Sequence, residues 1–361
     1  MMTREEAARH ARSAPFGRGR MSQDDAAPPP ANRVTLKTIA EATGLSLSTV
    51  SLSLRGGTTL KQETRDKVNA AAKALGYVPD RAGVRLRTGK TNVLALVLGG
   101  AEDSVDFARQ MIRGIGQAIR GSAYHLNVAP EFDTGSTDTI RYILENRTAD
   151  GVIITHTSPR DPRIRLMLDA GFPFVTHGRT EFSDQHAFHD FHAEAFATMA
   201  VERLASKGCR RVTLAIGDDQ TNNHRNIVTA FRETASRHGL DARLLEGATG
   251  RSPADLRRMG IELARASDRP DGLICDSEMR AIALLAGLVE AGVAPGRDMQ
   301  LVYKQTSGIV PTLFPLVDSI SEDIFAAGQE LTTLLRRRID GESISDLQTL
   351  AEPQPQWRSG D

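Results

Sequence analysis

Apolar residues recur along this 361-residue chain in two different patterns. In residues 34–75, apolar side chains stand three and four positions apart, the spacing that places them on one face of an α-helix. From residue 92 onward, short continuous apolar runs alternate with longer segments of helical spacing. This second pattern is typical of parallel strands covered by helices on both faces.

The first region predicts helices at residues 36–42, 46–55 and 61–75. Gly44 can supply the unusual backbone angle of a tight turn, and the hydroxyl of Ser46 can cap the second helix by accepting from a free backbone N–H. Two short helices joined in this way form a helix-turn-helix.

The second helix of this motif divides into an apolar and a polar face. We expect Val50 and Leu54 to pack inward against Ile39. The side chains expected to face outward are short, polar or cationic, which suits a helix lying in a DNA groove. They are Ser48, Thr49, Ser51, Ser53 and Arg55.

The second region predicts an α/β body. The expected strands are residues 92–98, 124–128, 151–154, 172–176, 211–216, 272–275 and 299–303. The expected helices are residues 107–119, 137–146, 193–206, 226–238, 253–266, 278–291 and 323–339. A segment of about 260 residues suits two lobes, with a ligand cleft at the carboxyl ends of the parallel strands.

These patterns divide the chain into five parts. Residues 1–33 are rich in Ala, Arg and Pro and predict a disordered tail, in which Met1 and Met21 are both open as the translation start. Residues 34–78 form a helix-turn-helix domain and residues 79–91 a hinge helix and linker. An effector-binding and dimerisation domain spans 92–354, and 355–361 form a second tail.

Charge and cysteine content narrow the class of protein. Residues 34–90 contain ten Lys and Arg against four acidic residues, whereas the whole chain is neutral. A basic module joined to an acidic body is the pattern of a nucleic-acid binder. Two cysteines, Cys209 and Cys275, give no disulfide framework, and we find no signal peptide and no run of ~20 apolar residues. We therefore expect a cytoplasmic protein without a membrane segment.

The head, the hinge and the body together resemble the LacI/GalR family of bacterial transcriptional regulators. The resemblance lies in VTLKTIAEATGLSLSTVS, ETRDKV and LGYVPDRAGVRL, and continues more weakly through residue 354. It implies a three-helix head with a hinge helix, followed by a two-lobed body like that of type I periplasmic binding proteins. It also implies a homodimer on a pseudo-palindromic operator, controlled by a small-molecule effector.

The resemblance also implies which residues touch DNA. Base reading falls to Leu47, Ser48 and Leu52, although a leucine can contact only a thymine methyl or pack. Leu86 of the hinge would wedge into the minor groove and bend the duplex. The other DNA contacts that we expect are Thr35, Ser46, Thr49, Ser51, Arg55, Thr59, Thr64 and Arg81.

The effector site departs from the family pattern. The position of a family arginine four residues before the aromatic Phe231 is Ile227, and His177 replaces a family aspartate, with Arg179 following. Arginine and histidine favour an anionic or phosphorylated ligand, so a sugar phosphate or another small metabolite stands beside the sugar as an expected effector. The residues expected to bind it are Phe107, His156, His177, Arg179, Asp190, His224, Arg225 and Asp276.

Other readings of the sequence have less support. His186, His189 and His192 recur every third residue, but on a loop or strand this spacing does not collect side chains for a metal, so we expect no metal and assign Asp190 to helix capping or to the pocket. Gly99-Gly100 lacks a phosphate-binding motif, and we expect neither an enzyme nor a cofactor. A solute-binding protein of a transport system shares the body architecture, but the helix-turn-helix favours a transcriptional regulator, most simply a repressor.

Overall fold

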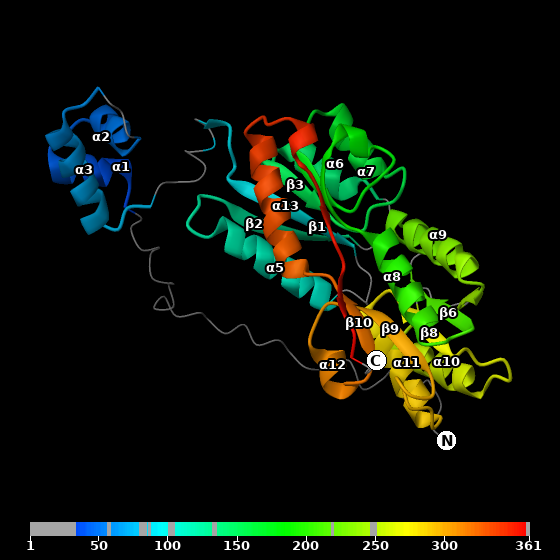
Figure 1. Ribbon diagram of the computed structural model, residues 1–361. Helices are drawn as coiled ribbons and strands as arrows, with labels where there is room; N and C mark the ends of the chain where they lie inside the picture. The colour runs from blue at the N-terminus through cyan, green and yellow to red at the C-terminus, as the bar shows by residue number, and fades with distance from the viewer. Residues whose placement is uncertain are drawn as a thin grey trace, which may run out of the picture. The chain divides into compact units, whose positions relative to one another are not determined.

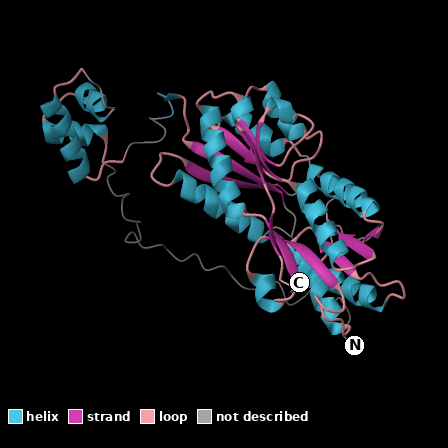
Figure 2. Cartoon of the chain, in the orientation of Figure 1, coloured by secondary structure: helices cyan, strands magenta, loops and turns pink. Residues whose placement is uncertain are grey.

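The computed structural model describes residues 34–55, 59–78, 85, 88–99, 105–131, 136–217, 220–245 and 251–358 (Figure 1). The chain divides into two compact units, residues 1–87 and 88–361. The tail expected at residues 1–33 and most of the expected hinge, including Arg81 and Leu86, lie outside the described residues. Helices and strands follow one another through the second unit (Figure 2).

The N-terminal unit contains three helices, α1 (Leu36–Thr43), α2 (Leu47–Leu54) and α3 (Gln62–Ala74). Gly44 ends α1 with φ +68°, and Ser46 caps α2 by accepting from the backbone N–H of Thr49 at 3.1 Å. Both features confirm the predicted helix-turn-helix. The buried core consists of Ile39, Val50, Val68 and Ala72.

The expectation for Ser53 was wrong, because its side chain is only 3% exposed. Ser53 follows Val50 by three positions, and residues three apart share a helix face, so the inward face of α2 carries Ser53 with it. Leu75, just beyond the end of α3, is 37% exposed.

The first lobe of the body is built on a six-stranded parallel sheet of order β11-β5-β4-β3-β1-β2. Alternate residues of β1 point to opposite faces. Leu94 and Leu96 pack with α5 and α13, and Ala95 and Val97 pack with α6 and α7. The strands are β1 (Val93–Gly99), β2 (His125–Glu131), β3 (Gly151–Ile154), β4 (Phe174–His177), β5 (Ala187–Phe191) and β11 (Gln348–Ala351). The helices are α5 (Val105–Ile119), α6 (Asp138–Asn146), α7 (Pro162–Asp169) and α13 (Ile324–Ile339), with short turns η2 (Ser183–Gln185) and η3 (Ile344–Asp346).

The second lobe repeats the plan with order β12-β10-β9-β8-β6-β7, in which only β12 is antiparallel to its neighbour. Helices α8 and α9 cover one face, and α10, α11 and α12 cover the other. The strands are β6 (Arg211–Ala215), β7 (Asp241–Leu244), β8 (Gly272–Cys275), β9 (Gln300–Gln305), β10 (Asp318–Ser321) and β12 (Gln354–Gln356). The helices are α8 (Ala193–Ser206), α9 (Asn222–Arg237), α10 (Pro253–Arg265), α11 (Glu278–Glu290) and α12 (Ile309–Leu313).

The chain crosses between the lobes three times, from β5 to α8, from β10 to α13, and from β11 to β12. These crossings bring the carboxyl ends of the two parallel sheets to face each other. The α/β fold with two lobes is therefore confirmed. Within the described residues, no helix is both long and apolar enough to span a membrane.

Candidate functional site

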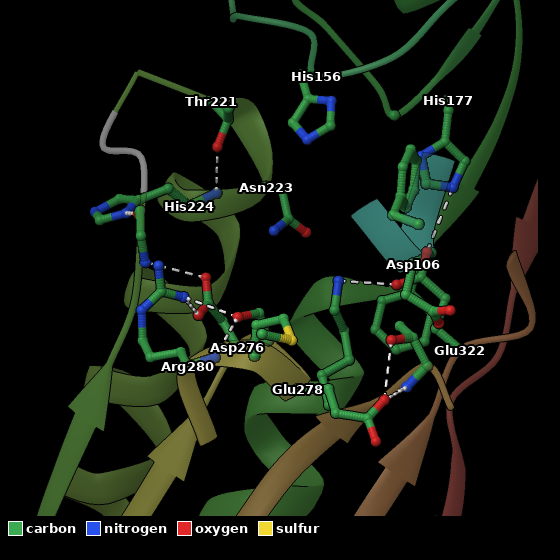
Figure 3. Close-up of a pocket in the computed structure, with 18 of the residues that line it drawn as sticks. Asp106, His156, His177, Thr221, Asn223, His224, Asp276, Glu278, Arg280 and Glu322 are labelled. Carbon is green, nitrogen blue, oxygen red and sulfur yellow. Dashed lines mark hydrogen bonds and ion pairs between the residues drawn. The ribbon is translucent and has the colours of Figure 1, made fainter. Parts of the chain in front are cut away.

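A cavity of about 220 Å³ lies between the two lobes (Figure 3). Its lining comes from the carboxyl ends of strands in both sheets, the place where open parallel sheets bind ligands. His177 ends β4, Asp276 follows β8 and Glu322 follows β10. The volume suits one small molecule rather than a long polymer.

The first-lobe wall of the cavity carries an aromatic and imidazole cluster. The ring of Phe107 lies 5.4 Å from the rings of both His156 and His177, measured between centroids. Figure 3 shows His156 pointing into the cavity above Asn223. This wall offers ring faces and imidazole nitrogens to a ligand.

Arg179 also lines this wall, but carboxylates already surround its guanidinium. Its Nε donates to Asp190 Oδ2 at 2.6 Å and its Nη2 to Glu194 Oε2 at 2.7 Å. Asp190 is therefore an arginine partner in the cavity lining, and the helix-capping role considered for it is wrong. His192 stands at the N-cap of α8 instead. Burial raises the pKa of Asp190, against the opposing effect of Arg179.

The second-lobe wall centres on Arg280, in the first turn of α11. Its Nη1 pairs with Asp276 Oδ1, and Asp276 Oδ2 accepts from the backbone N–H of Gly217 at 3.1 Å. A Cβ atom on residue 217 would collide with the guanidinium. Glycine at 217 is thus what allows Arg280 to lie in the wall beside Asp276.

Glu278 also lines this wall, but its carboxylate is already engaged by neighbouring groups of the protein. Its carboxylate accepts from the backbone N–H groups of Thr306, Ser307 and Val310 and from the Thr306 hydroxyl, at 2.5 to 3.3 Å. It therefore acts as a cap that fixes the loop after β9. His224, in the first turn of α9, places its Nδ1 2.7 Å from the carbonyl oxygen of Gly217.

A buried cluster of three charged or titratable groups joins the lobes at the base of the cavity. Lys304 of β9 lies 2.8 Å from Glu322 Oε2, and His177 Nε2 of β4 lies 3.3 Å from Glu322 Oε1. Burial would raise the pKa of Glu322, but Lys304 and His177 outweigh it and hold that pKa at about 2. Glu322 therefore stays ionised and links side chains from both sheets.

The helix-turn-helix offers a different kind of surface. Leu47 is 51% exposed at the start of α2, and Ser48 beside it is exposed as well. The Ser46 hydroxyl lies 2.8 Å from the hydroxyls of both Ser48 and Thr49, and Arg55 donates from Nε to the carbonyl of Ser51 at 2.6 Å. Thr35 caps α1 by accepting from Thr38. Thr59 is exposed, and Thr64 and Leu52 are half-buried.

Comparison with known proteins agrees with both parts of the chain, the helix-turn-helix and the two-lobed body. Residues 35–80 match the model of the bacterial regulatory proteins, lacI family, and residues 201–359 match that of a periplasmic binding protein-like domain. The HTH-type transcriptional regulator RafR of Escherichia coli is 29% identical over 317 residues, covering 85% of this chain and 90% of RafR. Residues 35–80 thus match the DNA-binding domain of the lacI family, and the relatives that align with most of the chain are regulators of this kind.

Solved structures of family members share the fold. The lac repressor dimer bound to operator and the anti-inducer ONPF aligns with a TM-score of 0.77 at 18% identity, covering 91% of this chain and 98% of that one. The transcriptional regulator CelR in complex with cellobiose aligns with a TM-score of 0.65 at 24% identity, covering 91% and 100%. These structures show the shared fold; the match of residues 35–80 and the curated relatives make the chain a DNA-binding transcriptional regulator and not a transport protein.

The structure brings together most of the effector residues expected from the sequence. Those that line the cavity are Phe107, His156, His177, Arg179, Asp190, His224 and Asp276. Arg225 does not line it and points to Glu181 and Asn222 instead, at 3.1 and 2.6 Å.

The sequence analysis did not identify many of the other lining residues. Among them are Asn223, Glu278, Arg280, Lys304 and Glu322. Asn223 and Arg280 each lie in the first turn of a helix that follows a strand, a signal that could have found them. Lys304 and Glu322 carry no such signal, because they meet only through the folding of β9 and β10.

The three regularly spaced histidines go to separate partners. His186 contacts Thr180 at 2.9 Å, His189 contacts Thr349 at 2.8 Å, and His192 contacts Glu352 at 3.1 Å. Over the part of the chain that the structure describes, no group of three or more His, Cys, Asp or Glu could hold a metal ion.

Proposed function

We propose that this regulator binds a pseudo-palindromic operator as a homodimer and represses transcription, under the control of an uncharged, hydroxyl-rich small molecule in the cleft. Residues 34–78 would bind DNA and residues 79–91 would form the hinge helix and linker. Residues 92–354 would bind the effector and dimerise. The relatives are regulators, and we assign no catalytic step to the chain.

The pairing of every cation in the cavity lining supports the proposed ligand class. Arg179 lies against Asp190 and Glu194, Arg280 against Asp276, and Lys304 against Glu322. A phosphate would need arginine or lysine charges that are not already neutralised. This arrangement argues against the anionic ligand that the sequence favoured. Paired charges still offer both donors and acceptors, which suits sugar hydroxyls.

A thermal-shift titration of the purified protein tests this ligand class. The panel would contain cellobiose, the sugar in the related CelR complex, together with other neutral di- and monosaccharides and their phosphates. A neutral sugar at about 100 times its Kd should stabilise the protein by about 2.7 kcal/mol. Stabilisation by sugar phosphates, with no effect of any neutral sugar, would reject the proposed class.

The surface of α2 supports a mode of DNA reading with few direct hydrogen bonds to bases. Leu47 offers only an apolar contact, and the Ser46 hydroxyl is already engaged as a helix cap. Specificity would then lean on methyl contacts and on DNA deformability, with Leu86, outside the described residues, as the proposed wedge.

Fluorescence anisotropy with a selected palindromic site tests the DNA-binding proposal. If six or more phosphate contacts form per dimer, affinity should fall by about 10³-fold or more between 50 and 200 mM salt. Leu86→Ala should weaken specific binding and leave the body folded. Tight binding that ignores salt would contradict the proposal.

A further inference from the structure

His156 has a backbone conformation that is rare outside glycine. It stands two residues after β3 with φ +54°, in the left-handed region, which costs an L-residue roughly 1–2 kcal/mol. Such strain persists only where the surroundings enforce it, and it gathers at functional sites. His156 lines the cavity, and Figure 3 shows its imidazole directed inward.

A buried arginine behind the wall holds this backbone. Arg163 of α7 is 3% exposed, and its Nη2 donates to the carbonyl oxygen of His156 at 3.0 Å. Asp161 grips the same guanidinium at two points, accepting from Nε at 2.9 Å and from Nη2 at 2.6 Å, while Nη1 pairs with Glu131 at the end of β2. A planar guanidinium can serve all three partners at once, whereas a lysine ammonium cannot reproduce this fork.

The imidazole itself is seated on three sides. The Thr155 hydroxyl lies 3.2 Å from its Nδ1, and the Phe107 ring meets it edge-on. A Cβ atom on Gly99 of β1 would stand 3.2 Å from His156 Cγ, so the ring occupies the space that glycine leaves open. With the backbone fixed by Arg163, these neighbours restrict the His156 ring to one orientation.

The same loop also touches the second lobe. Asp161 accepts from the backbone N–H of Ser158 at 3.1 Å, which fixes the end of the loop. The carbonyl oxygen of Thr157, next to His156, accepts from the backbone N–H of Asn222 at 3.2 Å. The loop anchored by Asp161 and Arg163 thus lines the cavity with His156 and contacts the opposite lobe through the Thr157 carbonyl.

We propose that Arg163 is a positioning residue of the effector site, which acts through the His156 carbonyl to aim the His156 imidazole into the cleft. The proposal rests on the cleft being the effector site. Arg163 does not line the cavity and would not touch the ligand.

The first test needs no ligand. Histidine imidazole NMR signals of the full chain labelled with ¹³C at Cε1 would be compared in wild type, Arg163→Lys and Asp161→Asn, with the His156 signal assigned from His156→Ala. Arg163→Lys should move the His156 signal and leave that of His238, an exposed residue of the other lobe, in place. An unmoved His156 signal in either folded variant overturns the proposal.

Arg203→Lys provides the matched control. Arg203 is 11% exposed at its side chain and also pairs with an aspartate, its Nε lying 2.7 Å from Asp318, but neither residue lines the cavity. Its replacement should lower stability without moving the His156 signal. If Arg203→Lys moves the signal as much as Arg163→Lys does, the effect is general loosening, and the positioning role is rejected. Asp161→Asn keeps the test decisive if Arg163→Lys does not fold.

A double-mutant cycle with cellobiose as the probe measures whether Arg163 and His156 act together in ligand binding. Arg163→Lys and His156→Ala should each weaken cellobiose binding by about 10-fold, and the double variant should bind no worse than His156→Ala alone. Additive losses would show that Arg163 does not act through His156 and would overturn the proposal. If wild type does not bind cellobiose, this sugar is not the effector, and the ligand-free NMR comparison decides on Arg163 by itself.

Discussion

The two walls of the cleft use a buried arginine in opposite ways. In the first lobe, Arg163 lies behind the wall, pairs with Asp161 and Glu131, and shapes the backbone of His156. In the second lobe, Arg280 lies in the wall itself, pairs with Asp276, and faces the cavity. The same kind of ion pair therefore supports the backbone in one lobe and lines the cavity in the other. The side chain of Asp276 is 13% exposed, whereas those of Asp161 and Glu131 are 1% and 4% exposed.

Replacing Arg163 should give the largest effect. Arg163→Met leaves Asp161 and Glu131 buried with no counter-charge, and breaking a buried pair in this way costs about 3–5 kcal/mol. Urea denaturation followed by circular dichroism would measure the loss in free energy of unfolding. A loss below that of Arg280→Met would break the comparison between the walls.

Acid should destabilise the first lobe before the second. Burial and the neighbouring His177 lower the pKa of His189 to about 4 in the folded protein, against about 6.5 when unfolded. As the pH falls, His189 is therefore protonated in the unfolded chain before it is protonated in the folded protein. The free energy of unfolding, which is at its full value above pH 6.5, decreases as the pH falls toward 4, by up to about 3 kcal/mol.

Hydrogen exchange at pH 7 and pH 4.5 would locate this loss. On going from pH 7 to pH 4.5, protection against exchange should fall more for the amides of β4 and β5 than for those of β6 and β8. His189→Asn should reduce this dependence of protection on pH. Glu322, with a folded pKa of about 2, would contribute only at lower pH, because its stabilising charge is lost between about 4.5 and 2. Equal acid sensitivity of both sheets would contradict the assignment to His189.

Replacing Arg280 should cost less and change recognition more. Arg280→Met leaves Asp276 without its partner, but the carboxylate borders the cavity, where water can solvate it, so we expect a loss of about 1–3 kcal/mol. The cavity lining would gain an unpaired negative charge. Thermal-shift titration should then show stabilisation by small amines that leave wild type unaffected.

Two helical glycines, one packed against a neighbouring helix and one facing open space, should give the smallest effects on stability. A Cβ at Gly287 of α11 would collide with the carbonyl oxygen of Arg257 in α10, whereas a Cβ at Gly116 of α5 meets open space. Gly287→Ala should destabilise by about 1–3 kcal/mol through overpacking. Gly116→Ala should stabilise by about 0.5–1 kcal/mol, since alanine is the better helix former. Thermal melts of both variants, side by side, check the difference in sign.

Local signals explain how much of the fold could be predicted. The turn at Gly44, the cap at Ser46 and the apolar runs at β1, β3 and β8 are each written in a few consecutive residues. The strands missed from the sequence, such as β5 (AFHDF) and β12 (QPQ), have no continuous apolar run and lie where the chain crosses between lobes. Ser53 was misplaced because it was assigned to the outer face by its polarity, although its spacing of three from Val50 places it on the inward face of α2.

The sequence by itself determined the helix-turn-helix and the two-lobed body, because periodicity and motif spacing are local, and its family resemblance pointed to seven of the residues that line the cleft. Only the tertiary structure decided how the charges of the cleft are used. Lys304, Glu322 and His177 come from different strands, and Arg163 meets Glu131 across 32 positions of the chain. Distances between such groups fix which cations are neutralised, and they are the reason why we propose an uncharged ligand, one of the two classes that the sequence left open.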